Sequence, residues 1–305
     1  LTVYKRSGDT FTKLADPAVL PAGSGRGCAF SPDGTYLAVV HATSPFLTVY
    51  KRSGDTFTKL ADPATLPLNT PGRCVFSKDG VYLALAVTAD PFIAVYKRSG
   101  DTFTKLASPS SVPNSSVYSV AFSPDGTYLA AAHYTSPFLT VYKRSGDTFT
   151  KLANPAVLPT GSGQGCAFSP DGNYLAVVHA TSPFLTVYKR SGDTFTKLAD
   201  PAVLPAGNGK ECTFSADGTY LAVTVDISPY IDIYKRSGDI FTKLAGLTTS
   251  PGGSNSVAYS PDGNYLVLGR PMSPYLSIYK SADALLLPAI ASPDPRLNYY
   301  IKTGA

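Results

Sequence analysis

The stretch LTVYKRSGDTFTKL, residues 1–14, decides the architecture of this chain because it returns unchanged at 47–60, 139–152 and 185–198. Variants of it start at Ile93 and Ile231, and a shorter remnant starts at Leu276. Its tyrosines stand at positions 4, 50, 96, 142, 188, 234 and 279, so five successive spacings are 46 residues and one is 45. A fixed period of roughly 20–50 residues is typical of a repeat architecture in which each unit packs against the next. The chain is therefore predicted to be a tandem array of one small structural unit.

Each unit is predicted to contain four short strands and two tight turns. In one full copy the candidate strands are A at 27–31, B at 35–41, C at 46–52 and D at 56–61, all rich in β-branched and aromatic residues. The A–B turn is Ser31-Pro32-Asp33-Gly34 and the C–D turn is Ser53-Gly54-Asp55, because proline presets φ and glycine accepts a positive φ. The D–A connections are long and proline-rich, as in 62–73. No segment has the apolar spacing of a capped helix, so the predicted class is all-β.

The unit resembles a WD-like propeller repeat, and with FSPDGTYLAVV at 30–40 as its A–B hairpin it is similar to the prokaryotic YVTN-type propellers. This resemblance implies a β-propeller of four-stranded antiparallel blades. The chain has no tryptophan, and Thr48-Val49-Tyr50-Lys51 stands where strand C of a WD repeat would end in Trp-Asp. The side-chain network that supports WD blades is therefore not expected. The near-identical copies also resemble the repeat-amplified propellers of phage structural proteins.

The number of blades follows from counting hairpins. Seven C–D hairpins start at residues 1, 47, 93, 139, 185, 231 and 276, whereas six Ser-Xaa-Asp-Gly hairpins accompany them, so we predict seven blades, with six as the alternative. The propeller is assigned to 1–290 and a C-terminal tail to 291–305. The chain opens with half a blade, and Ser292-Pro293-Asp294-Pro295 resembles an A–B turn, so the tail is predicted to close the ring as a composite blade. Since Leu1 falls inside a repeat, we also expect that a segment preceded it.

Composition and charge exclude some partners. Charged residues make up 15% of the chain, which suits a virion or extracellular surface as well as the cytoplasm. The net charge is +5, but Lys-Arg pairs recur once per unit and an aspartate follows each of the six pairs three residues on, as Asp9 follows Arg6. A nucleic-acid partner needs basic clusters without such compensation, so none is predicted. The pairs are interpreted as a solvated ring of charges. No stretch of about 18 apolar residues exists, so no membrane span is predicted.

The cysteines and histidines each occupy one repeat position. The cysteines are residues 28, 74, 166 and 212, and valine replaces them in two other copies, which indicates reduced, buried, apolar positions. Their spacing fits neither a disulfide between blades nor a zinc signature. The histidines are residues 41, 133 and 179, and they are interpreted as half-exposed strand ends because valine replaces them too. The recurring Asp33-type residues are interpreted as turn formers. No metal and no cofactor is predicted.

A few charged residues break the symmetry of the repeat. They are Asp90, Glu211, Asp226, Asp232 and Arg270. An enzyme on this frame would need such unique side chains to converge at one end of the ring. Because they are spread over three units, we interpret them as ion pairs or solvated charges. A YVTN-like hydrolase or lactonase would instead bring Asp90, Glu211, Asp226 and Arg270 together.

The D–A and B–C connections vary most between copies, and in a propeller both emerge on the same face. A face whose loops vary between copies, on strands that stay nearly constant, indicates a binding surface. The alternative is that these loops tolerate change and have varied without a function. We therefore predict a non-enzymatic binding or assembly scaffold, in its most specific form a phage virion surface or tail component that recognises a host protein or glycan. The alternatives are the lactonase and an intracellular WD-like interaction scaffold. The expected contact residues are Tyr118, Tyr134, Arg73, Lys210 and Glu211. A competing interpretation places the contact on the constant Lys-Arg-Ser-Gly-Asp face.

Overall fold

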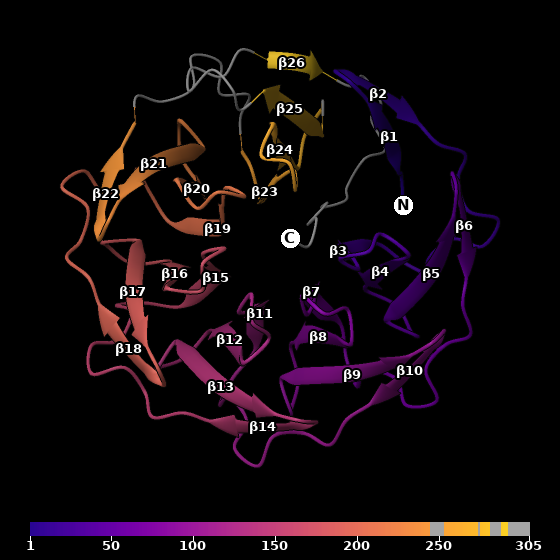
Figure 1. Cartoon of the computed structure of the whole chain (residues 1–305), viewed down its shortest axis with the longest axis horizontal. Helices are drawn as coiled ribbons and strands as arrows, with labels where there is room; N and C mark the ends of the chain where they lie inside the picture. Colours follow the sequence, from indigo (N-terminus) through magenta and orange to yellow (C-terminus); the bar gives the residue numbers. More distant parts are fainter. Residues whose placement is uncertain (245–252, 274, 281–287, 292–305) are drawn as a thin grey trace.

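The computed structural model describes residues 1–244, 253–273, 275–280 and 288–291. Antiparallel four-stranded sheets stand side by side around a central axis, each with its first strand innermost and its last strand at the rim (Figure 1). The described part of the chain forms six such sheets, and a two-stranded hairpin lies between the first and the last of them. The prediction of an all-β propeller with four-stranded antiparallel blades is confirmed. Within these residues no helix has the length and apolarity needed to cross a bilayer.

Each blade runs outward from the axis in chain order, as strands A, B, C and D. Blades 1 to 6 have inner strands A and B at β3 (Gly25–Phe30) and β4 (Tyr36–His41), β7 (Pro71–Phe76) and β8 (Tyr82–Val87), β11 (Val117–Phe122) and β12 (Tyr128–His133), β15 (Gly163–Phe168) and β16 (Tyr174–His179), β19 (Gly209–Phe214) and β20 (Tyr220–Val225), and β23 (Ser256–Tyr259) and β24 (Tyr265–Gly269). Their outer strands C and D are β5 (Leu47–Ser53) and β6 (Thr56–Lys59), β9 (Ile93–Ser99) and β10 (Thr102–Lys105), β13 (Leu139–Ser145) and β14 (Thr148–Lys151), β17 (Leu185–Ser191) and β18 (Thr194–Lys197), β21 (Ile231–Ser237) and β22 (Ile240–Lys243), and β25 (Leu276–Lys280) and β26 (Pro288–Ala291). The extra hairpin consists of β1 (Tyr4–Ser7) and β2 (Thr10–Lys13).

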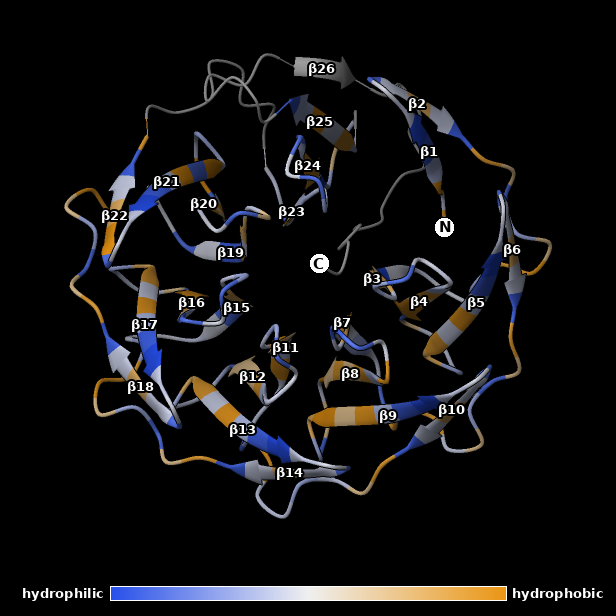
Figure 2. Cartoon of the chain, viewed as in Figure 1, coloured by the Kyte–Doolittle hydropathy of each residue, from blue (hydrophilic) through white to orange (hydrophobic). Residues whose placement is uncertain are grey.

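The apolar core lies between the blades. In β8, Leu83 and Leu85 pack toward blade 1, whereas Ala84 and Ala86 pack toward blade 3. Successive side chains of a strand point to opposite faces, so a strand covered on both faces must be apolar at every position. Strand C follows this rule only at its start: β9 and β13 begin apolar and end in the hydrophilic Lys-Arg-Ser (Figure 2). The repeat therefore places its charges at one rim of the disc.

The A–B turn is formed by its own side chains. Ser31 Oγ donates to Asp33 Oδ1 at 2.5 Å, and the same oxygen accepts the backbone N–H of Thr35 at 3.0 Å. Gly34 closes the turn with φ of 69°, which other residues adopt only with strain. The Ser–Asp contact recurs in every blade, so the prediction that these aspartates form the turn is confirmed.

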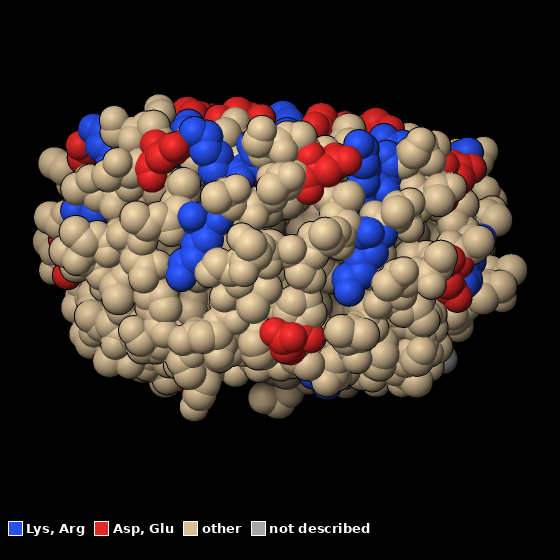
Figure 3. Space-filling view, turned by 90° about the horizontal axis from the view of Figure 1, so that it is seen from below, with Lys and Arg blue, Asp and Glu red and all other residues tan. Residues whose placement is uncertain are grey.

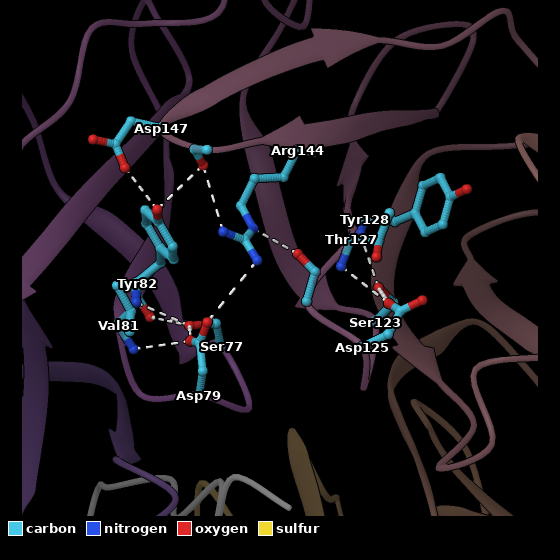
Figure 4. A network of polar contacts seen from close by, with 12 residues as sticks. Ser77, Asp79, Val81, Tyr82, Ser123, Asp125, Thr127, Tyr128, Arg144 and Asp147 are labelled. Carbon is cyan, nitrogen blue, oxygen red and sulfur yellow. Dashed lines mark hydrogen bonds and ion pairs between the residues drawn. The ribbon is translucent and has the colours of Figure 1, made fainter.

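Polar side chains tie each blade to the next. Between blades 2 and 3, Tyr82 Oη donates to Asp147 Oδ1 at 2.6 Å (Figure 4). Lys97 Nζ lies 2.8 Å from Oδ2 of the same carboxylate. The hydrogen bonds from Lys97 and Tyr82 hold the pKa of Asp147 below its usual value. The guanidinium of Arg144 stacks 4.6 Å from the centroid of the Tyr82 ring, and its Nη2 lies 3.9 Å from Asp79 Oδ2. This junction takes the place of the network of a WD propeller.

The same junction recurs around the ring. Its Tyr, Lys, Arg and Asp are Tyr36, Lys51, Arg98 and Asp101 between blades 1 and 2, Tyr128, Lys143, Arg190 and Asp193 between blades 3 and 4, and Tyr174, Lys189, Arg236 and Asp239 between blades 4 and 5. Acidic and basic side chains accordingly gather along one rim of the disc, and few lie on the opposite rim (Figure 3). The Lys-Arg pairs form the predicted ring of charges at the C–D turns, and most of them also join the blades: among the described contacts, five of the six arginines pack on a tyrosine ring and five of the six lysines bind an aspartate of the next blade.

We expect Tyr128→Phe to lower the free energy of unfolding by about 1–2 kcal/mol, because it removes a hydrogen bond to a charged group. Tyr128 Oη lies 2.5 Å from Asp193 Oδ1 and 3.1 Å from the carbonyl oxygen of Gly192. Urea denaturation measures the change. The matched control is Tyr134→Phe, since the Tyr134 side chain is exposed and its loss of a hydroxyl should change stability by under about 0.5 kcal/mol. Equal stabilities for both variants would contradict the role of the junction.

The hairpin β1–β2 occupies a seventh position in the ring. Tyr265 Oη donates to Asp9, and the Arg6 guanidinium stacks 4.9 Å from the centroid of the Tyr265 ring. On the other side Lys5 Nζ lies 2.8 Å from Asp55 Oδ2 of blade 1. These contacts copy the junctions between full blades, so the hairpin is the outer half of a blade. The inner half predicted from the tail falls on residues 292–305, outside the described residues.

The four cysteines are buried thiols, as predicted. The thiols of Cys74 and Cys212 point to carbonyl oxygens of the preceding blade, at 3.9 Å from Ala38 and 3.8 Å from Ala176. They therefore serve as small packing residues between blades.

Candidate active site

The residues nearest the axis lie at the start of the A strands. The sequence places Arg73, Lys210 and Glu211 in D–A loops, but they belong to β7 and β19. Both strands open with a register shift, between Pro71 and Arg73 and between Gly209 and Glu211. Such a bulge adds one unpaired residue and re-aims the next side chain. Glycine and proline at the bulge are residues typical of loops, so the sequence alone places the start of the strand too late.

Two opposite charges meet at this level of the axis. Aligned copies place Gly27, Arg73, Ser119, Gly165, Glu211 and Ser256 at one repeat position. Arg73 Nη1 and Glu211 Oε2 form an ion pair, although β11 and β15 lie between β7 and β19 around the ring (Figure 1). The pair therefore spans the axis, and it occupies a position that is glycine or serine in the other aligned copies.

Backbone groups and burial hold the pair in place. The Glu211 side chain is 2% exposed and that of Arg73 is 21% exposed. Arg73 Nη2 donates to the carbonyl oxygen of Asn255 at 3.3 Å, and the backbone N–H of Glu211 donates to Thr224 Oγ1 at 3.0 Å. A cavity of about 10 Å³ lies beside the pair, which is room for roughly one water molecule. The site thus combines a carboxylate, a cation and space for water.

Lys210 is positioned at the rim of this site by a loop contact. Asp226 accepts hydrogen bonds from the backbone N–H of Asn208 at 2.9 Å and from Asn208 Nδ2 at 2.8 Å. Lys210 Nζ lies 3.8 Å from Asp226 Oδ2, the oxygen that accepts the hydrogen bond from Asn208 Nδ2. A B–C loop thereby holds a D–A connection, and the prediction that these loops share one face is confirmed.

The remaining symmetry-breaking charges do not join this site. Asp90 is exposed and makes no described contact with the others. Asp232 is buried and pairs with Lys243 at 2.8 Å. Arg270 is 7% exposed, and its Nε and Nη1 have no hydrogen-bond partner among the described residues. Burial lowers the pKa of the Arg270 guanidinium. The predicted set of Asp90, Glu211, Asp226 and Arg270 is therefore not one cluster, and Arg73 is the partner of Glu211.

Tyr118 and Tyr134 lie together on blade 3. Their ring centroids are 6.3 Å apart and the ring planes meet at 88°, an edge-to-face contact. Tyr134 is 55% exposed, on the loop after β12, whereas Tyr118 lies on β11. The backbone of Tyr118 lies beside Gly72 of the neighbouring strand β7, the residue before Arg73. The pair therefore flanks the charged site on the same face.

The three histidines are fully buried, so the interpretation of half-exposed strand ends is wrong. His41, His133 and His179 are the last residues of their B strands, and the Nε2 atom of each lies 2.9–3.0 Å from a threonine hydroxyl of strand C. The histidine and the threonine change together between copies: blade 2 has Val87 at the histidine position and Ala94 at the threonine position. The histidines are thus parts of the core, not of the site.

One site residue escaped the sequence analysis. Arg26 lines the small cavity together with Arg73 and Glu211, and it is exposed. Its repeat position carries glycine, tyrosine, glutamine, lysine and asparagine in the other copies, and this variability was the available signal. In the described residues no three His, Cys, Asp or Glu side chains are grouped as metal ligands. The opposite end of the axis is an apolar cavity of about 310 Å³, lined by Phe76, Phe122 and their equivalents.

The fold and the axial pair define a propeller with a carboxylate–guanidinium pair at one end of its axis. The model of a family described as lactonase, 7-bladed beta-propeller, matches residues 57–285. The chain therefore belongs to the lactonase seven-bladed β-propeller family. A comparison with curated protein sequences found no match.

Solved structures with the same fold include proteins of different kinds. A Bacteroides uniformis protein assigned as a candidate 6-phosphogluconolactonase has a TM-score of 0.74 and 17% identity, over 94% of this chain and 90% of that one. The periplasmic gluconolactonase of Pseudomonas aeruginosa has a TM-score of 0.71 and 21% identity, over 96% and 93%. The Myceliophteria thermophila Cps50 (Swd1) β-propeller domain has a TM-score of 0.71 and 12% identity, over 100% and 93%.

These findings correct the functional prediction. A non-enzymatic binding or assembly scaffold was predicted from the variable loop face, and this is wrong: the family is a lactonase family, and two of the similar structures carry lactonase names. The prediction failed because it required four charges to converge. The structure instead brings together two charges from non-adjacent blades, Arg73 and Glu211.

Proposed function

We propose that this protein hydrolyses a sugar lactone at the Arg73–Glu211 site. The observation that carries the proposal is the buried ion pair at a repeat position that is glycine or serine in the other aligned copies. Membership of a lactonase family and the lactonase names of similar propellers support the reaction class. The other blades carry glycine or serine at this position and still form four-stranded sheets, so the fold does not require these two charges.

The geometry assigns a role to each group. Glu211 accepts a proton from a water molecule in the small cavity, and the water oxygen attacks the lactone carbonyl carbon. Arg73 donates hydrogen bonds to the oxyanion that forms on the carbonyl oxygen. The ring C–O bond then breaks, and Glu211 returns its proton to the leaving alkoxide, which gives the open hydroxy acid. The lactone carbonyl would replace part of the contact that Arg73 now makes with Glu211.

Neighbouring residues would bind the rest of the substrate. Arg26 and Lys210 add positive charge at the rim, which favours a substrate with an anionic group. Tyr118 and Tyr134 are proposed to pack against the sugar ring, because an aromatic ring offers apolar area beside a polar edge. The likeness to repeat-amplified phage proteins stays a prediction about the origin of the repeats.

The direct experiment is a pH-stat assay of the purified protein with δ- and γ-lactones of aldonic acids. We expect acid release well above the spontaneous rate, saturating with lactone concentration. Lactones that carry a phosphate or carboxylate should have the lower KM. Rates equal to the blank for all of these lactones would contradict the proposed function.

A further inference from the structure

The axis carries a second set of departures from the repeat, at the end opposite the axial ion pair. Two residues after the repeat position of that pair, blades 2 and 5 have Val75 and Thr213, whereas the other four blades have alanine. At the second position of the A–B turn, the same blades have Lys78 and Ala216, whereas the other four have proline. Blades 2 and 5 therefore differ from the rest at both ends of the axis.

All four of these residues line the apolar cavity of about 310 Å³ at this end of the axis. The walls of the cavity come from five consecutive blades, 2 to 6, each of which has four strands. Its volume is about twice that of an apolar cavity of about 150 Å³ that holds one benzene molecule. The cavity therefore has room for an apolar group of about two fused aromatic rings.

The aromatic wall of the cavity is fixed by a second ring in each blade. Phe76 makes an edge contact with Phe103 of strand D, and the ring centroids are 6.2 Å apart. Phe168 contacts Phe195 in the same way, also at 6.2 Å. Because these rings are held before any ligand arrives, an apolar ligand would bind without the entropic cost of ordering the wall.

Lys78 is the one charged residue among the described residues that line the cavity. Its side chain is exposed, and it forms no ion pair within the described part of the chain. The adjacent Asp79 Oδ2 lies 3.9 Å from Arg144 Nη2, and the turn aspartates of blades 3, 4 and 6 also pair with an arginine. Most turn carboxylates at this end are thus neutralised, whereas the charge of Lys78 is available to a ligand.

We propose that the axial cavity binds an arene carboxylate with an apolar part of about two rings. The ligand ring packs against the phenylalanine rings of the wall, in the offset or edge-to-face contacts that aromatic pairs prefer. The carboxylate stays at the mouth of the cavity, where the Lys78 ammonium neutralises it. One ammonium matches one negative charge, so a monoanion is favoured. This site lies at the opposite end of the axis from the proposed lactonase site and does not depend on that activity.

The test uses naphthoate as the probe and the neutral naphthamide as its matched control, each titrated into the full chain by isothermal titration calorimetry. We expect saturable one-to-one binding of naphthoate. Naphthamide should bind about fivefold more weakly, since this is the usual limit for the contribution of an exposed ion pair. The variant Thr213→Leu fills part of the cavity and should weaken the binding of both probes about tenfold.

A second variant tests the role of the lysine. Lys78→Pro restores the residue of four other A–B turns, and it should lower the affinity for naphthoate to that for naphthamide. Its matched control is Lys105→Ala, which removes the same charge from the outermost strand of the same blade and should leave both affinities unchanged. If circular dichroism shows that Lys78→Pro is unfolded, Lys78→Ala makes the same test, because Ala216 stands at this position in blade 5.

Four outcomes would overturn the proposal. They are the absence of saturable naphthoate binding, equal affinities of the unaltered protein for the two probes, unchanged binding in folded Thr213→Leu, and equal losses in the Lys78 and Lys105 variants. Every readout is the binding of a probe that is not a lactone. A failure of this proposal is therefore distinguishable from a failure of the lactonase assay.

Discussion

Glu211→Gln is expected to lower kcat for lactone hydrolysis by about 100-fold to 10,000-fold, the usual contribution of a general base. The amide keeps the shape of the side chain but cannot accept the proton of the attacking water. The neighbours of Glu211 stay in place, because its backbone N–H is held by Thr224 and Arg73 is held by carbonyl oxygens. Initial rates at saturating lactone, compared with the unaltered protein, measure the effect.

A loss of activity must be separated from a loss of stability. Removing one partner of a buried ion pair costs about 3 kcal/mol or more, whereas removing both is often neutral. The control is therefore the double variant Arg73→Ser with Glu211→Ser, since Ser119 and Ser256 occupy the same repeat position. This variant should unfold at nearly the same urea concentration as the unaltered protein and still lack activity. A folded double variant with unaltered kcat would refute the assignment of the site.

The protein is expected to lose about 5 kcal/mol of its unfolding free energy between pH 7 and pH 4.5, because buried histidines must stay neutral in the folded state. Burial lowers the pKa of His133 and of His179 to about 4, from an ordinary value of 6.5. The unfolded chain therefore binds more protons than the folded protein in this window. Stability is fully present above pH 6.5 and falls as the pH drops toward 4. Urea denaturation at a series of pH values measures the slope.

Blade 2 supplies the control for this titration. It carries Val87 and Ala94 where blades 3 and 4 carry a His–Thr pair. A variant with His133→Val, Thr140→Ala, His179→Val and Thr186→Ala should lose most of the pH dependence above pH 4.5. The junction aspartates, whose pKa values are lowered by lysine and tyrosine hydrogen bonds, also lose their contribution to stability as the pH falls, but only near or below pH 4. An unchanged slope in the quadruple variant would show that other groups cause the acid sensitivity.

Much of the fold could be predicted because the chain contains several copies of the same information. Comparison of the copies separated the residues that all copies share from those that differ. Tight turns such as Ser31–Gly34 were predictable because the proline and glycine that form them are close together in the sequence. The start of strand A was predicted two residues late, because a bulge with glycine or proline looks like a loop. The buried state of His41 and its equivalents was also missed, since a strand end is exposed in one sheet and covered when a neighbouring blade packs on it.

The sequence by itself determined the repeat, the all-β class, the order of strands and turns, and the positions at which copies differ. Each of these depends on contacts within one unit of about fifty residues or fewer, where local propensity and alternation act. Only the tertiary structure decided that Arg73 and Glu211, which are 138 residues apart in numbering, meet across the axis. It also decided that Arg144 stacks on Tyr82 of the preceding blade. Closing a ring brings distant units together, and no local pattern records which side chains then face one another.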